Sequence, residues 1–101
     1  MEVKLQIFKN RILVSNGVNE ISISADEPFS TQRLLVGNFE AAWKCVEQAE
    51  KELSIKGLFK KKPKVIVVPK ELIEGGVSQI EDRVFRELSM ALNPSSVEIL
   101  P

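Results

Sequence analysis

Apolar and polar residues alternate along the first quarter of the chain with the two-residue period of a half-buried strand. Val, Leu and Ile occupy every second position in three short segments within residues 3–24. Asn16-Gly17, a strong turn signal, separates the second of these segments from the third. The pattern therefore predicts a three-stranded antiparallel meander over residues 3–24, followed by an irregular segment over residues 25–37.

Apolar residues then recur every three or four positions, which is the spacing of an amphipathic helix. This stripe begins at Phe39, includes Trp43 and ends at Leu53, and Asn38 can cap the helix N-terminus. We expect Trp43 to anchor the core. Cys45 borders the stripe, and we expect an inert, half-buried thiol, since a lowered thiol pKa needs a cationic or helix-N-terminal setting.

A second strand and helix follow. Residues 64–68 form a β-branched run that is apolar after Lys64, so we expect both faces of this strand to be covered. Ser78 and Glu81 have the spacing of a capping box and predict the start of a helix. Its buried stripe is expected to contain Ile80, Val84, Leu88, Ala91 and Leu92. Asn93 can end it in the left-handed conformation, and residues 97–100 form a last short strand.

The predicted order of elements is β-β-β-α-β-α-β. A strand, helix and strand at the end imply a right-handed parallel crossover onto the sheet. The predicted fold class is therefore α/β: an N-terminal antiparallel β-meander that continues into an α-β-α-β unit, with one mixed sheet and two helices. A length of 101 residues suits one domain, residues 1–101.

Composition narrows the classes of function. Fourteen basic residues balance fourteen acidic ones, so the net charge gives no general attraction to nucleic acid or to a membrane. The single cysteine and the absence of an apolar leader predict a cytoplasmic protein. The chain has no histidine, which removes the commonest general base and most zinc arrangements. We expect neither an enzyme nor a bound cofactor or metal.

The basic loop at residues 55–64 is the main candidate site. It places the apolar pair Leu58-Phe59 among lysines. The lysines expected to take part are Lys56, Lys60, Lys61 and Lys62. Leu and Phe can enter the headgroup boundary of a membrane while lysines attract anionic lipid. The alternatives are a solvated loop with one apolar side chain folded back onto the core, and a short nucleic-acid patch.

Two weaker signals lie near the second helix. Gly75-Gly76 precede it, and glycines at a helix N-terminus can cradle an anion. No lysine follows at P-loop spacing, so a plain turn is the favoured interpretation. The acidic residues Glu71, Glu74, Glu81 and Asp82 superficially resemble paired catalytic acids. Without a histidine or a defined cleft, we interpret them as solvated charge, with Glu81 capping its helix.

Several segments follow one another in an order known from a protein family. Leu58-Phe59 is followed by P-K-V-I-V-V-P at residues 63–69, and then by G-V-S-Q-I-E-D-R-V at residues 76–84. Asn38-Phe39-Glu40 precedes them. These segments resemble the L-F-x-P-R-V-V-x-x-V-P, G-I-T-x-V-E-x-R-A and D-F-E segments of the bacterial actin-like, rod-shape-determining (MreB-like) proteins. Residues 5–14 resemble the second and third strands of that family.

The resemblance implies an actin-like (ribonuclease H-like) subdomain that lacks the family's nucleotide-binding loops, and so no ATPase activity. It also implies that a short apolar loop at residues 55–64 docks on the inner membrane. The expected function is a non-catalytic protein-interaction module, a partner or regulator of an actin-like cell-shape protein. The expected protein partner is a second copy or an actin-like protein. The alternatives are an unrelated binding domain with a relic actin-like fold, and a nucleotide binder that completes its site by oligomerising.

Overall fold

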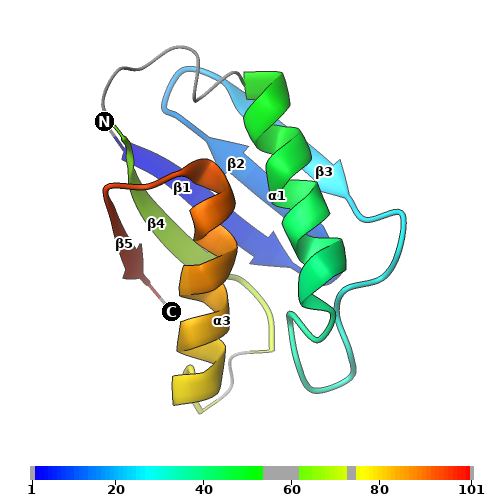
Figure 1. The fold of residues 1–101 in the computed structure, drawn as a ribbon. Helices are drawn as coiled ribbons and strands as arrows, with labels where there is room; N and C mark the ends of the chain where they lie inside the picture. Colours follow the sequence, from blue (N-terminus) through cyan, green and yellow to red (C-terminus); the bar gives the residue numbers. More distant parts are fainter. Residues whose placement is uncertain (1, 54–61, 73–74, 101) are drawn as a thin grey trace.

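Five strands form one mixed sheet in the computed structural model, which describes residues 2–53, 62–72 and 75–100. The strands are β1 (Glu2–Phe8), β2 (Arg11–Ser15), β3 (Glu20–Ser24), β4 (Lys64–Pro69) and β5 (Ser96–Ile99). Their order across the sheet is β3-β2-β1-β4-β5 (Figure 1). β1, β2 and β3 pair antiparallel, whereas β4 pairs parallel with both β1 and β5. The predicted meander, parallel crossover and mixed α/β sheet are confirmed.

Within the described residues, two helices pack on the same face of this sheet (Figure 1). α1 (Phe39–Leu53) lies over β2 and β3, and α3 (Gln79–Ser89) lies against β4 and β5 and continues into the short 3-10 helix η1 (Met90–Leu92). The core fills the space between helices and sheet. Its fully buried strand side chains are Val3, Leu5, Ile7, Ile12, Val14, Val65 and Val67.

The second face of the sheet lies against neither described helix, so helices cover only one face of residues 64–68 in the described part of the chain. The topology gives the reason. The strand order advances from β1 to β4 to β5 in one direction, and right-handed crossovers that advance in one direction place their helices on one face. Ile66, which points to the second face, is nevertheless only 8% exposed. Its strand neighbours there are Lys4 and Glu98.

The buried faces of the helices differ in part from the predicted stripes. Ile80 is 76% exposed, and Phe85 takes the central core position of α3 with Leu88. Phe85 lies five positions after Ile80, which places their side chains about 140° apart around the helix. In α1, Phe39 is also exposed, and its ring lies 5.7 Å from that of Trp43. Trp43 is half-buried at the margin of the core rather than at its centre.

The irregular segment between β3 and α1 supplies three core residues that the pattern did not predict: Phe29, Leu35 and Val36. Asn10, in the turn between β1 and β2, holds this segment in place. Its side-chain oxygen accepts the N–H groups of Phe29 at 2.9 Å and Ser30 at 2.7 Å. The Ser30 hydroxyl in turn accepts the Asn10 N–H at 3.0 Å. The segment has no regular secondary structure, but its position is fixed by these contacts.

The predicted helix ends are confirmed. The Asn38 side chain accepts the Ala41 N–H at 3.2 Å at the start of α1. Ser78 and Glu81 form both halves of a capping box at the start of α3. After η1, Asn93 adopts the left-handed conformation with φ 52°.

Candidate functional site

The predicted basic loop lies almost wholly outside the described residues. The structure places Lys62, which is exposed directly before β4. The other predicted contact residues lie outside the described part of the chain: Lys56, Leu58, Phe59, Lys60 and Lys61. A membrane contact at this loop therefore stays a prediction.

The N-terminus of α3 has the geometry of a capped turn. Gly75 and Gly76 have φ of +80° and +93°, angles that favour glycine. The Ser78 hydroxyl accepts the Glu81 N–H at 3.1 Å, and the Glu81 carboxylate accepts the Ser78 N–H at 3.2 Å. These bonds already satisfy donors that an anion would need, so the plain turn remains the better interpretation.

The described acidic residues near α3 do not converge on one point. The Glu71 carboxylate accepts the Lys9 N–H at 2.6 Å, and Asp82 pairs with Arg86 at 2.6 Å. Glu81 caps its helix. Across residues 2–53, 62–72 and 75–100, no three carboxylate or thiol side chains are grouped as a metal site would need.

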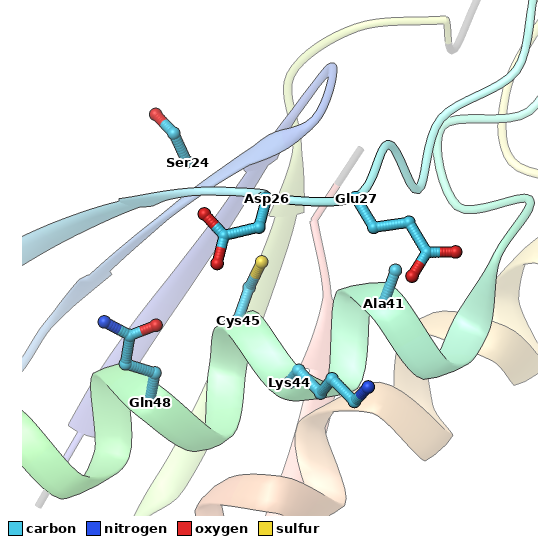
Figure 2. A pocket seen from close by; sticks show the side chains of 7 residues that line it. All are labelled: Ser24, Asp26, Glu27, Ala41, Lys44, Cys45 and Gln48. Carbon is cyan, nitrogen blue, oxygen red and sulfur yellow. The ribbon is translucent and has the colours of Figure 1, made fainter.

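A small pocket of about 180 Å³ lies between the end of β3 and α1 (Figure 2). Its lining residues are Ser24, Asp26, Glu27, Ala41, Lys44, Cys45 and Gln48. Burial raises the pKa of the Cys45 thiol, and the nearby Asp26 carboxylate raises this pKa further. The prediction of an inert thiol is therefore supported, because a raised pKa leaves little of the reactive thiolate. Lys44 is also paired, with Glu40 at 3.7 Å.

This pocket was not predictable from the sequence, because its walls come from separate elements. Asp26 and Glu27 lie in the segment after β3, whereas Lys44 and Gln48 lie on the outer side of α1. Only the packing of α1 over β3 brings these two groups together.

The second face of the sheet, here called the open face, combines apolar and charged side chains. Its apolar members are Phe8, Leu13, Ile66, Val68 and Leu100. Leu13 and Val68 flank Gln6 across three adjacent strands. Charged groups frame them: the Arg11 guanidinium lies 4.0 Å from the Phe8 ring centroid, and Lys64 pairs with Glu98 at 3.5 Å.

Comparison with known proteins identifies one relationship. No protein-family model matches the chain. The chain is 33% identical over 89 residues to Uncharacterized protein YjaA of Escherichia coli (strain K12), and the match covers 83% of this chain and 70% of that protein. The chain belongs to the YjaA family. The name of this relative states no activity.

The two outer strands of this YjaA-family fold are protected to different degrees. β5 has four residues, and the Arg86 side chain on α3 donates to the Val97 carbonyl of this strand at 3.0 Å. β3 has five residues and, among the described strands, pairs with β2 alone. No other described residue makes a hydrogen bond to its outer edge. The open face and the β3 edge are therefore the surfaces available for contact with another molecule.

A helix that crosses a bilayer needs a continuous apolar stretch of about 20 residues. Within residues 2–53, 62–72 and 75–100, no helix is both long enough and apolar enough to cross a bilayer.

Proposed function

We propose that this chain is a non-catalytic protein-interaction module that acts as a partner or regulator of an actin-like cytoskeletal protein near the inner membrane. The observation behind this proposal is the open face beside β4. Residues 65–68 are uniformly β-branched, a composition typical of strands with both faces covered. The helices in the described part of the chain both lie on one face.

The content of the open face fits contact with another protein. Leu13 and Val68 are half-buried, and Leu100 is exposed, so all three can lose further apolar surface on binding. The charged groups at the margin resemble the polar rim around the apolar centre of an interface. Leu100 extends the β5 line, because its N–H donates to the Val67 carbonyl at 2.9 Å.

The actin-like part of the proposal comes from the resemblance of residues 58–100 and 38–40. The element order and the mixed sheet support it, since a meander followed by α-β-α-β is what the resemblance implies. Actin-like folds bury these elements within a larger molecule. A chain built like one such subdomain presents a sheet face that a larger actin-like protein can cover.

A pull-down from the native cell tests the partner. The tagged chain is compared with Leu13→Lys/Val68→Lys, and captured proteins are read by mass spectrometry. We expect an actin-like protein with the parent chain and at least tenfold less with the double variant, because two charges enter the apolar centre of the face. Ile80→Lys is the matched control, since Ile80 is 76% exposed on α3, on the opposite side of the sheet from the open face. The proposal fails if no actin-like protein is enriched, or if the double variant captures as much as the parent.

Liposome flotation tests the membrane part separately. We expect the parent chain to float with vesicles that contain anionic lipid, and Leu58→Glu/Phe59→Glu to remain in the soluble fraction. A parent chain that does not float contradicts the membrane contact and leaves the protein partner to the pull-down.

A further inference from the structure

Among the residues that the structure describes, none pairs with one edge of the β3 backbone, and the hydrogen bonds at its two ends show which residues point outward. The Asn16 N–H donates to the Asn19 carbonyl at 3.1 Å, and the Ala25 N–H donates to the Asn10 carbonyl at 2.9 Å. Hydrogen-bonded pairs alternate along an antiparallel ladder. Residues 21 and 23 therefore bond to β2, and residues 20, 22 and 24 direct their N–H and C=O groups away from the sheet.

We propose that two copies of the chain pair antiparallel through β3, with Ser22 opposite Ser22 of the partner. This inference rests on the proposed function, because it names one surface through which the module associates. Only the outward residues can exchange hydrogen bonds, and Ser22 is the middle one. The register around Ser22 also places Glu20 opposite the partner's Ser24, so all the outward backbone groups of β3 are used. The result is a continuous sheet across a twofold axis.

The side chains of β3 are self-complementary in this register. Ile21 lies opposite the partner's Ile23 on the side of the sheet that faces the helices, where Ile23 is already buried. Apolar β-branched residues directly opposite each other stabilise strand pairs. The zero net charge of the chain adds no long-range repulsion between copies.

Charged side chains on the open face also meet oppositely charged side chains of the partner in the proposed register. The Arg11 side chain donates from Nη1 to the Ser22 hydroxyl at 3.2 Å, so its guanidinium already reaches β3. In the proposed register the partner's Glu20 is the diagonal neighbour of Ser22 on the same face. Diagonal neighbours lie within reach of long side chains. The twofold axis gives two such contacts between Arg11 and the partner's Glu20.

The same register accounts for two unexplained surface features. It brings the partner's Val18 next to Asp26, at the pocket between β3 and α1 (Figure 2). Val18 is the most exposed of the large apolar residues in the described chain, at 88%.

At the opposite edge of the sheet, Arg86 already occupies the Val97 carbonyl, so β5 is the less suitable strand for pairing.

Sedimentation velocity over a concentration series tests the pairing with the full chain and with Ser22→Pro. The Ser22 N–H points outward, so proline removes a donor of the free edge and no bond to β2. We expect a monomer–dimer equilibrium for the parent in the micromolar range and a monomer for Ser22→Pro. Circular dichroism checks that the variant is folded. A parent that is monomeric up to millimolar concentration overturns the proposal, as does a folded Ser22→Pro that still dimerises.

A charge exchange tests the register without a proline. Arg11→Glu and Glu20→Arg should each weaken the dimer roughly tenfold, and the double variant should recover most of the loss. Glu98→Arg, on β5, is the matched control and should leave the dimer unchanged. Single variants that dimerise like the parent overturn this register. If the chain is monomeric but still captures an actin-like protein, the proposed dimer alone is wrong. If the chain dimerises but captures no actin-like protein, the proposed function alone is wrong.

Discussion

Asn10 links two parts of the fold that are far apart in the sequence. It adopts a φ of 55°, which asparagine tolerates better than most residues. From that position its side-chain oxygen accepts two N–H groups of the segment that contains Phe29. These N–H groups are partly buried, so they would lose their partner without full access to water.

Replacing Asn10 separates its two roles. Asn10→Gly keeps the positive φ but removes the acceptor, and we expect a loss of about 2–3 kcal/mol for two hydrogen bonds. Asn10→Ala should lose about 1 kcal/mol more, because alanine is strained at this φ. Asn10→Asp is the control, since it keeps an acceptor oxygen. Urea unfolding followed by Trp43 fluorescence measures the differences, and an Asn10→Gly variant as stable as the parent would contradict this role.

The buried thiol of Cys45 should make the free energy of unfolding depend on pH in the alkaline range. Burial raises the pKa of this thiol in the folded chain, whereas the unfolded thiol titrates near pH 8.5. Above about pH 8.5 the unfolded state therefore loses its proton first, and the free energy of unfolding falls as the pH rises towards the folded pKa. Cys45→Ala should lack this part of the decline. Urea unfolding at intervals between pH 7 and 10.5 measures it, and parallel curves for the two proteins would count against the raised pKa.

Single residues also show what the sequence could and could not predict. The caps at Asn38 and Ser78 were predictable, because each depends on a residue within three positions. The burial of Phe29 was not, since it depends on Asn10, which lies 19 residues earlier. Short-range patterns contain the first kind of information and lack the second.

Among the elements of the fold, α3 links the hydrophobic core to β5, the edge strand whose Val97 carbonyl accepts a hydrogen bond from Arg86. Phe85 and Leu88 pack into the core. Arg86, on the outer side, pairs with Asp82 and donates to the Val97 carbonyl of β5. The same helix therefore stabilises β5 and occupies a backbone group through which this strand could pair with another chain.

The capping box fixes where α3 begins. Ser78→Ala removes the hydroxyl that accepts the Glu81 N–H, and we expect a loss of about 1 kcal/mol in the free energy of unfolding. Gln79→Ala, one residue further on, is the control and should change stability by less than about 0.5 kcal/mol. Thermal and urea unfolding measure both. Equal stability of Ser78→Ala and the parent would show that the cap does not limit this helix.

The apolar spacing predicted which residues are helical, but it did not predict which side of α3 faces the core. Residues 39–53 and 79–89 are helical as the apolar spacing indicated. The spacing of α3, however, admitted either Ile80 or Phe85 at the centre of the buried face, and packing against β4 and β5 selected Phe85. Periodicity alone could not decide between them, because both choices leave an apolar stripe.

For the whole molecule, β4 is where sequence and fold disagree most. Its apolar run predicted a strand with both faces covered; the strand forms, but the described helices lie on one face only. A sequence pattern records whether a side chain is shielded from water, and it does not distinguish shielding by the chain itself from shielding by a partner. The open face could not be predicted either, because it forms only when the strand register aligns Leu13, Gln6 and Val68.

Two adjacent residues of β4 therefore test the one-sided core. Val67 is fully buried beneath the helices, and Val68 is half-buried on the open face. Threonine has nearly the shape of valine, so the substitution mainly adds a hydroxyl. In the isolated chain Val67→Thr should cost about 1–3 kcal/mol, because its hydroxyl is buried, whereas Val68→Thr should cost less than about 0.5 kcal/mol.

The two substitutions, Val67→Thr and Val68→Thr, should rank in the opposite order when partner binding is measured in place of stability. In capture of the actin-like partner, Val68→Thr should weaken binding, because the hydroxyl enters the interface, while Val67→Thr should bind normally as long as it is folded. Urea unfolding and the pull-down together measure both orders. Equal losses of stability for the two variants would contradict a core on one side of the sheet, and equal capture would contradict the open face as the place of contact.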